Sequence, residues 1–361
     1  MGMSSGSRVV AFGEIMGRLA APGHQRFQQA MPGGLEVTFA GAEANVAMSI
    51  AHLGGQASFV TALPEHAVAD ACVANLRAVG VDTRHILRTP QGRLGLYFLE
   101  TGVNQRPGNV IYDREGSSVS ITPPKDYPWD EIFHGAGWFH ISGITPAISK
   151  NAAAVALHAL REASSRGLRI SCDLNFRSKL WTWKAGLRPH ELATLAMREL
   201  LPYVHVLIGG REDAAAMMGI HASPGSTDPV LDVSRQIKAL YPQVTHVAMT
   251  LRKSLSANHH NWGGMLYDSA LDEVFLAPLN GDRYQPYAIT DIVDRLGGGD
   301  AFAAGLIHAL NSPDLAEPQT ALGFAVAASC LAHSIPGDFN FTTRDEVEAL
   351  MAGNVSGRVN R

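Results

Sequence analysis

Residues 294–305 contain the side chains best suited to chemistry, because three consecutive glycines lead into Asp300 and then into an alanine-rich helical pattern. Glycine has no Cβ, so its main-chain N–H group can approach a phosphate closely. The positive end of a helix favours the negative charge that grows during phosphoryl transfer. Asp300 could accept a hydroxyl proton there, while Gly297, Gly298 and Gly299 form an anion hole. A helix cap after a glycine turn is the simpler alternative.

Two further segments carry polar side chains where a ligand could bind. Gly41 opens a helical pattern in which Asn45 lies one turn in. An amide both donates and accepts, which suits a polyol, and glycine lets a ligand lie against the backbone. Asp173, Asn175 and Arg177 follow an apolar run, and period-two alternation predicts that they point the same way, with Arg177 reaching a phosphate or carboxylate. The structural alternatives are an Asn45 satisfied by main chain and an Asp173–Arg177 ion pair.

Strand and helix patterns alternate around these residues. Short apolar runs that indicate strands lie at 8–12, 57–61, 138–142, 168–173, 204–208 and 244–251, and helical patterns lie at 43–53, 151–165, 189–200 and 230–240. This order predicts an α/β fold with a mostly parallel central sheet and helices on both faces. Ligands of such a sheet bind beyond the carboxyl ends of its strands.

Two stretches break the alternation. Residues 19–39 and 94–111 have alternating apolar residues without a helical period, so we expect them to form a small separate β-sheet that acts as a lid. With no internal repeat and no long linker, the chain is expected to be a single domain over residues 1–361. The exposed edges of the lid also offer a surface for a homo-oligomer.

Composition narrows the choice of partner. The 361 residues carry a formal net charge of −4, which gives no basic field for nucleic acid and favours a small molecule. No apolar stretch reaches the roughly 18 residues of a membrane span, and residues 1–7 lack the order of a signal peptide. Cys72, Cys172 and Cys330 have neither zinc nor disulfide spacing, which favours a reducing cytoplasm.

Taken together, these segments resemble the ribokinase-like (PfkB) carbohydrate kinases, and in particular the 2-keto-3-deoxygluconate kinases. The pattern from Asp294 to Asp300 is similar to the family signature D-x-x-G-A-G-D, with Gly298 in place of alanine. The other matching segments are the sugar-binding glycine and asparagine at 41–45, the lid strand at 96–97, the D-x-N-x-R motif at 173–177 and a closing segment at 334–340. The resemblance covers nearly the whole chain.

The resemblance implies a ribokinase-like fold and an ATP-dependent kinase that phosphorylates 2-keto-3-deoxygluconate to its 6-phosphate, with Asp300 as general base. It implies ATP and Mg²⁺ as cofactors, and it leaves open a requirement for a monovalent cation such as K⁺. The residues implied for the sugar acid are Gly41, Asn45, Tyr97, Arg114, Arg177 and Asp300, and those implied for the nucleotide are Asn175, Arg177, Thr250, Arg252, Gly297 and Gly299. From its own segment alone, Arg114 would be a solvated turn residue.

Two departures from the family pattern leave alternatives open. The metal-associated N-x-x-E motif appears as residues 210–213 without its amide, so Asp213 is expected to organise Mg²⁺ through water. Asp113 stands where these kinases often have a second tyrosine, and its charge would repel an anionic ligand. A kinase of a neutral sugar such as fructose or ribose is one alternative, and a sugar-binding sensor without turnover is another. No dinucleotide fingerprint follows the first strand, which argues against a nicotinamide dehydrogenase.

Overall fold

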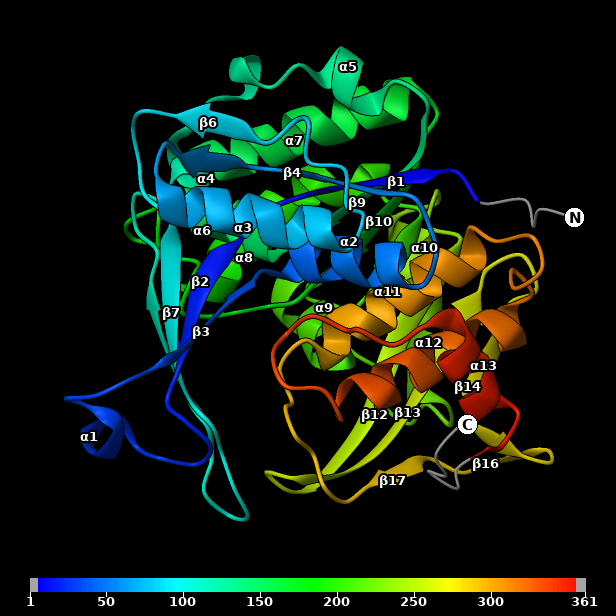
Figure 1. Cartoon of the computed structure of the whole chain (residues 1–361). Coiled ribbons are helices and arrows are strands. Elements are labelled where there is room, and N and C mark those ends of the chain that lie inside the picture. The colour runs from blue at the N-terminus through cyan, green and yellow to red at the C-terminus, as the bar shows by residue number, and fades with distance from the viewer. Residues whose placement is uncertain (1–5, 355–361) are drawn as a thin grey trace, which may run out of the picture.

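The structure is a computed structural model that describes residues 6–354. Residues 1–7 are not expected to form a signal peptide, and residues 1–5 of this segment lie outside the described part. Helices cover both faces of one large sheet (Figure 1). The helices are α1 Phe27–Ala30, α2 Ala42–His52, α3 Ala67–Ala78, α4 Ser118–Ile121, α5 Trp129–Phe133, α6 Ile144–Ile148, α7 Lys150–Ser165, α8 Pro189–Leu200, α9 Arg211–Met218, α10 Pro229–Leu240, α11 Gly298–Leu310, α12 Pro318–Ala332 and α13 Arg344–Met351.

The large sheet has the order β14-β13-β12-β11-β10-β9-β1-β4, and β17 also pairs with β13. The pairs from β4 to β12 are parallel, whereas β12, β13 and β14 form antiparallel pairs. The strands are β1 Arg8–Phe12, β4 Ala57–Val60, β9 Ala136–Ser142, β10 Arg169–Asp173, β11 Val206–Ile208, β12 His246–Ser256, β13 His259–Asp268, β14 Glu273–Ala277 and β17 Tyr287–Ile289. The predicted fold class, a mostly parallel sheet between helices, is confirmed.

Alternation along β1 shows how the sheet separates two cores. Val9 and Ala11 lie in the core that α2, α11 and α12 cover, and Val10 and Phe12 lie in the core on the opposite face, with α7 and α8. Successive side chains of a strand point to opposite faces of the sheet. Because helices cover both faces here, side chains that point either way are buried, which requires a continuous run of apolar residues. The sheet edge at the carboxyl ends is thereby left for polar side chains.

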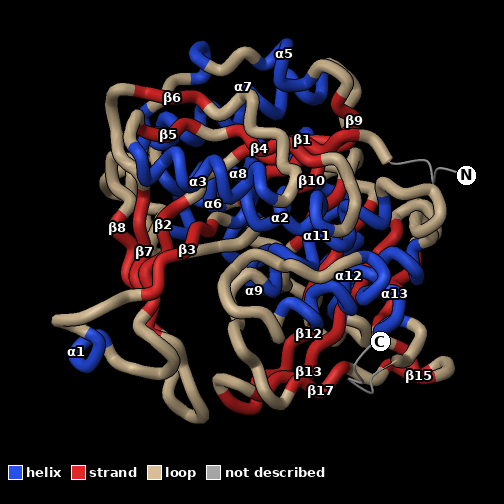
Figure 2. The backbone as a smooth tube through the Cα atoms, viewed as in Figure 1, coloured by secondary structure: helices blue, strands red, loops and turns tan. Residues whose placement is uncertain are grey.

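A second, smaller sheet stands beside the main body (Figure 2). Its order is β3-β2-β7-β8, with β2 and β7 parallel and the two outer pairs antiparallel. Its strands are β2 Met16–Ala20, β3 Glu36–Ala40, β7 Gly95–Glu100 and β8 Asn109–Asp113. We call these four strands the lid sheet. The predicted segments 19–39 and 94–111 overlap its strands only in part, because β2 begins at Met16, β8 ends at Asp113 and the first segment also contains the short helix α1.

Several elements lie outside the sequence prediction. It contained neither α3 nor the short strand pairs β5 Ala62–Pro64 with β6 Leu87–Thr89 and β15 Leu279–Asn280 with β16 Arg283–Tyr284. It also ended the last strand at residue 251, whereas β12 continues to Ser256 and turns back as β13. Within residues 6–354, no helix is both long and apolar enough to cross a membrane.

Candidate active site

A deep cleft of about 1360 Å³ lies between the lid sheet, the carboxyl ends of β10, β11 and β12, and the start of α11. Apart from Gly298, every residue that the sequence analysis assigned to the site lines this cleft. These residues are Gly41, Asn45, Tyr97, Arg114, Asn175, Arg177, Asp213, Thr250, Arg252, Gly297, Gly299 and Asp300. Segments up to 259 residues apart in the sequence therefore meet in one place, since Gly41 and Asp300 share the cleft wall.

The three glycines of the turn at the start of α11 have different roles. Gly297 has φ +76°, and a Cβ there would lie 2.1 Å from the carbonyl oxygen of Asp338, so only glycine fits. Gly298 faces His333 instead of the cleft, and its carbonyl accepts from Ser329 Oγ at 2.6 Å. Gly299 borders the cleft with open space around it. The first-turn N–H groups of α11 have no intrahelical partner, as an anion site needs.

Asp300 is held by a side chain and does not cap its own helix. Its Oδ2 accepts from Asn45 Nδ2 at 2.6 Å, and Asn45 Oδ1 in turn accepts from the N–H of Gly41 at 3.1 Å. The helix cap is Gly297, which makes no side-chain cap bond. The alternative that Asp300 is an ordinary cap is therefore wrong, whereas the main-chain partner foreseen for Asn45 is present beside its contact with Asp300.

Burial raises the pKa of Asp300 to about 7. The hydrogen bond from Asn45 opposes this rise, and the charge of Asp338 adds to it. Arg177 lowers the pKa and the buried Glu43 raises it. A carboxyl group that titrates near neutrality can exist as the free base and still accept a proton during turnover.

The reason for glycine at position 41 differs from the one expected. Its φ of 178° is extended, and a Cβ there would lie 1.9 Å from the carbonyl oxygen of Glu14. Close approach of the chain at Glu14 therefore excludes a side chain, although Gly41 still lines the cleft. Asn45 follows one turn into α2, which directs its amide toward Asp300.

The lid end of the cleft contains a buried ion pair. Arg114 is 7% exposed and donates to Glu14, which is 3% exposed, so Arg114 is not the solvated turn residue its own segment indicated. Oε1 of Glu14 and Nε of Arg114 have no hydrogen-bond partner in the described part of the chain. Tyr97 and Tyr112 lie opposite each other on β7 and β8 and line the same end.

Asp113 does not face the ligand side, which corrects the expected repulsion. It pairs with Arg93 at 2.7 Å in a half-exposed contact and does not line the cleft. The alternation of β8 places Tyr112 inward and Asp113 outward. The doubt about an anionic substrate that rested on this carboxylate is therefore removed.

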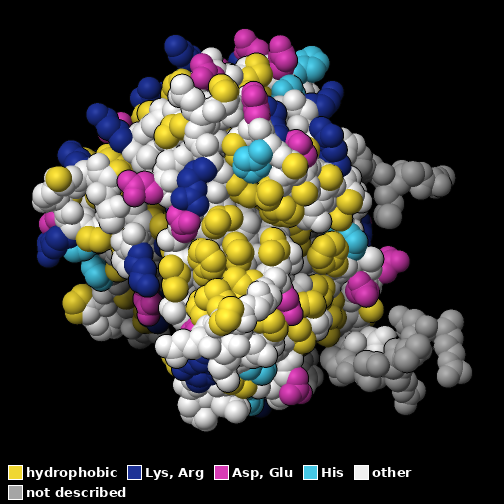
Figure 3. Space-filling view, turned by 60° about the vertical axis from the view of Figure 1, so that its left-hand side comes forward, with side chains coloured by type: hydrophobic (Ala, Val, Ile, Leu, Met, Phe, Trp, Pro, Cys, Tyr) yellow, Lys and Arg dark blue, Asp and Glu magenta, His cyan; other side chains and the backbone are white. Residues whose placement is uncertain are grey.

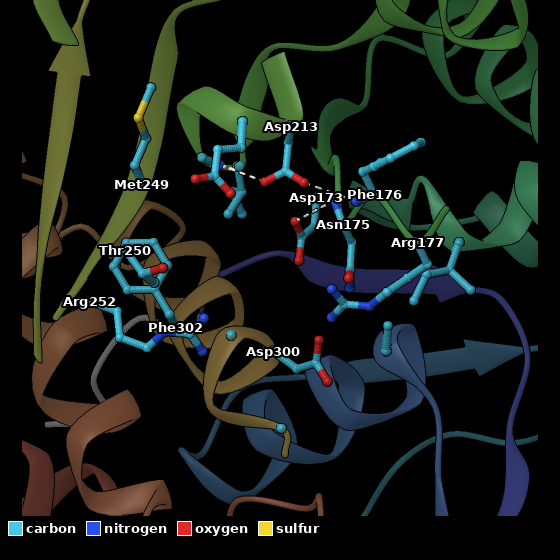
Figure 4. Close-up of a pocket in the computed structure, with 18 of the residues that line it drawn as sticks. Asp173, Asn175, Phe176, Arg177, Asp213, Met249, Thr250, Arg252, Asp300 and Phe302 are labelled. Atoms are coloured by element: carbon cyan, nitrogen blue, oxygen red, sulfur yellow. Dashed lines mark hydrogen bonds between the residues drawn. The ribbon is translucent and has the colours of Figure 1, made fainter. Parts of the chain in front are cut away.

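The segment after β10 reaches the site by a turn and not by strand alternation. The strand ends at Asp173, and Asn175 has φ +38° with its N–H bonded to Asp173 Oδ1 at 3.2 Å. Asp173, Asn175 and Arg177 do line the same cleft, but this turn brings them there and not the predicted strand alternation. No Asp173–Arg177 ion pair forms in the described residues. Figure 4 instead shows Arg177 extending between Asp173 and Asp300.

Asp213 holds two backbone segments together at the opposite side of the cleft. Its Oδ2 accepts from the N–H of Gly210 at 2.8 Å, and its Oδ1 accepts from the N–H of Phe176 at 3.1 Å (Figure 4). Each oxygen keeps a further lone pair. Among the described residues, no group of three or more His, Cys, Asp or Glu side chains could hold a metal ion.

Arginines without ion pairs gather on the side of the cleft next to the glycine turn. Arg177, Arg252 and Arg295 line this side, and none of them forms an ion pair within residues 6–354. Burial lowers the pKa of Arg252, and the charges of Arg295 and Arg177 lower it further. Such a group of cations favours a polyanion. The sequence analysis missed Arg295, although it lies inside the glycine motif.

A parallel α/β sheet, a glycine turn with a nearby carboxylate and a set of unpaired arginines define an α/β phosphotransferase of the sugar-kinase type. The sequence matches the pfkB family carbohydrate kinases over residues 7–342. The chain therefore belongs to that family and is an ATP-dependent carbohydrate kinase.

Individual relatives are similar over nearly their full length. A 2-dehydro-3-deoxygalactonokinase of Haloferax volcanii is 32% identical over 97% of this chain and 98% of its own. A 2-dehydro-3-deoxygluconokinase of Bacillus subtilis is 25% identical over 87% of this chain and 86% of its own. The crystal structure of a 2-dehydro-3-deoxygluconokinase from Thermotoga maritima is 39% identical with a TM-score of 0.88, and covers 98% of this chain and 100% of its own.

Proposed function

We propose that the protein transfers the γ-phosphoryl group of Mg-ATP to the primary hydroxyl of 2-keto-3-deoxygluconate or a close stereochemical relative. The observation that carries this proposal is the placement of Asp300, whose carboxylate lies in the first turn of α11 within one cleft with unpaired arginines and a buried arginine–glutamate pair. The relatives that act on 2-dehydro-3-deoxy acids support this substrate class.

Asp300 serves as the general base in this proposal. Its free carboxylate takes the proton of the attacking hydroxyl, and Asn45 fixes its orientation through the 2.6 Å hydrogen bond. The first-turn N–H groups beside Gly297 and Gly299 face the growing negative charge on the transferred group. Arg177, which reaches between Asp173 and Asp300, is placed to neutralise charge on the same group (Figure 4).

The nucleotide occupies the side with the unpaired arginines. Arg252 and Arg295 would bind its phosphates, and Asn175 and Thr250 line the same part of the cleft. Mg²⁺ would arrive with the phosphates of ATP and neutralise part of their charge. Asp173 and Asp213 line the cleft and would bind its water shell. A monovalent cation such as K⁺ stays a prediction of the family resemblance.

The sugar acid occupies the lid end. Arg114 would bind its carboxylate and Tyr97 would contact the sugar, while Gly41 and Asn45 border its hydroxyls. Because Glu14 already neutralises Arg114, the acid must share that guanidinium with Glu14. This pairing is the observation that keeps a neutral-sugar kinase as the second candidate.

The lid sheet is proposed to exclude water from the reacting groups. The loop after β7 reaches the hairpin of β12 and β13, where the N–H of Ala257 donates to the carbonyl of Asn104 at 2.7 Å. The N–H of Asn104 donates to Asn258 Oδ1 at 3.2 Å. The two hairpins therefore meet across the cleft, and such closure suppresses hydrolysis of ATP.

Phosphorus NMR with a panel of sugars and sugar acids tests the substrate class. The protein, Mg-ATP and each acceptor are mixed, and the sugar phosphate is followed directly. We expect transfer to 2-keto-3-deoxy acids, and Arg114→Met should raise KM for the acid by about 10- to 10²-fold, the size of a lost charge-assisted contact. Equal rates on fructose, ribose and the acids would reject the carboxylate assignment.

We also propose a homo-oligomer and a cytoplasmic location. The lid sheet exposes Val37 and Ile111, which are 61% and 48% exposed. The side of the molecule that bears the lid sheet carries a broad hydrophobic area (Figure 3). A second copy could cover such a surface. Cys72, Cys172 and Cys330 are all free thiols, in keeping with a reducing compartment.

A further inference from the structure

Two neighbouring strands of the lid sheet direct polar side chains at one carboxylate outside their own sheet. Arg18 on β2 and Tyr97 on β7 are paired in the parallel register. Both donate to Asp338 Oδ1, Tyr97 at 2.9 Å and Arg18 in an ion pair. Arg18 is 5% exposed, so its charge is enclosed by protein. Asp338 itself lines the cleft that holds Asp300.

The same guanidinium binds a second carboxylate, the one that opens the glycine motif. Arg18 donates to Asp294 Oδ2, and Asp294 is 6% exposed. Asp294 also accepts from the N–H of Leu296 at 3.1 Å and from the N–H of Gly337 at 3.2 Å. Arg18 therefore connects three segments: the lid sheet, the residues just before the glycine turn, and the closing segment 337–338.

The closing segment in turn shapes the glycine turn. A Cβ on Gly297 would lie only 2.1 Å from the carbonyl oxygen of Asp338, so the two segments are in close contact. A shift of Asp338 would therefore move the backbone of Gly297, and with it the first turn of α11. Without Arg18, the charges of Asp338 and Asp294 would be uncompensated in this enclosed place, which favours movement of these segments toward solvent.

We infer that Arg18 is a positioning residue for phosphoryl transfer, which sets the glycine turn and the electrostatic surroundings of Asp300 by holding Asp294 and Asp338 against the lid sheet. The inference rests on the proposed role of Asp300. Arg18 does not line the cleft, so it acts through the two carboxylates and not on the substrate. It also makes the position of the lid sheet and the geometry of the glycine turn depend on each other.

The charges that surround Asp300 decide the sign of the effect. Asp338 and Glu43 disfavour its ionised form, and Arg177 favours it. Asp173, at the end of β10, is a further carboxylate within electrostatic range, because the charge of Asp300 helps to raise the pKa of Asp173. Removing Arg18 leaves Asp294 and Asp338 without their counter-charge, so Asp300 should hold its proton to higher pH.

Kinetics of Arg18→Met and Arg18→Lys test the inference. For Arg18→Met we expect kcat to fall by about 10²-fold, the loss that a misplacement near 1 Å can cause, with the acid limb of the pH–rate profile shifted to higher pH. Added guanidinium should restore part of the rate. Lysine keeps the charge but lacks the two-pronged geometry, so Arg18→Lys should lose kcat with its acid limb near the wild-type position.

The double variant Arg18→Met/Asp338→Asn separates positioning from simple stability. Removing the Asp338 charge should move the acid limb back toward the wild-type pH. Arg93→Met is the matched control, because Arg93 also pairs with an aspartate, Asp113 of the lid sheet, but outside the cleft. Its profile should equal that of the wild type.

Two results would overturn the inference. One is an Arg18→Met enzyme whose acid limb is unmoved and whose rate follows the Arg93→Met control. The other is an absence of guanidinium rescue in an Arg18→Met protein that circular dichroism shows to be folded. If the Arg18→Met protein does not fold, an Arg18→Lys enzyme with wild-type kcat would overturn the inference instead. Failure of the proposed function can be distinguished from failure of this inference. If the proposed function is wrong, the wild-type enzyme itself would lack activity on the sugar acid or would show no fall in rate at low pH.

Discussion

Protonation of Asp300 should control the rate below neutral pH. Burial sets its pKa at about 7, so half of the enzyme carries a protonated base at that pH. Below it, kcat/KM should fall tenfold per pH unit, which leaves about 1% of the plateau rate at pH 5. An unperturbed aspartate, with a pKa near 3.9, would leave the rate at pH 5 almost unchanged. The two cases differ by roughly 10²-fold.

Measuring kcat/KM from pH 5 to pH 9 in the phosphorus NMR assay, or by coupled release of ADP, distinguishes these cases. Asp338→Asn provides the internal check, because the Asp338 charge raises the pKa of Asp300 and its removal should shift the acid limb to lower pH. A flat profile between pH 5 and pH 8, or an acid limb that does not respond to Asp338→Asn, would refute the reasoning.

The stability of the fold should change with pH in the opposite direction to the rate. The folded pKa of Asp300, about 7, lies above its unfolded value of about 3.9. Between these two pH values the folded state binds the extra proton, so this group lowers stability as pH rises through the window. Asp300→Asn should therefore raise Tm at pH 8 relative to the wild type, with a smaller difference at pH 4. An unchanged Tm difference across this range would contradict the assigned pKa.

Further predictions follow from individual contacts. Asn45→Ala removes the hydrogen bond that favours ionised Asp300, so the acid limb should move to higher pH and kcat should fall by about tenfold; an unmoved limb would exclude Asn45 from the site. Arg295→Met should raise KM for ATP by about 10-fold with little effect on KM for the sugar, as for a lost phosphate contact, and the reverse pattern would place the nucleotide elsewhere. Gly297→Ala adds a Cβ at φ +76° and 2.1 Å from the Asp338 carbonyl, which should lower Tm and kcat together, whereas Gly299→Ala, which meets open space, should leave Tm near the wild-type value.

The parts of the fold that the sequence predicted were those with strong local patterns. Strands covered by helices on both sides are continuous apolar runs, as in β1, and this signal needs no tertiary information. The β12–β13 hairpin was missed beyond residue 251 because its outer half is polar and β13 contains Gly263 and Gly264. Gly264 packs against Val326 of α12, where a Cβ would lie 2.7 Å away. That contact is tertiary and leaves no local pattern.

The candidate site was predictable to the extent that its residues lie in motifs. Asp300, Asn45 and Arg177 were found from their segments, but their mutual arrangement depends on the fold. Arg177 reaches the cleft through a turn at Asn175, which strand alternation could not foresee. Glu14 was not assigned because a single carboxylate after a strand carries no information until its partner, 100 residues away, is known.

The proposal that Asp300 is the base is decided by the single-turnover rate of Asp300→Asn with saturating Mg-ATP and 2-keto-3-deoxygluconate. The side chains are nearly equal in size and Asn45 can still donate to the substituted amide, so binding should change little. We predict a rate of phosphoryl transfer reduced by about 10²- to 10⁴-fold with both ligands bound. A rate within a few-fold of the wild type would contradict the proposed mechanism.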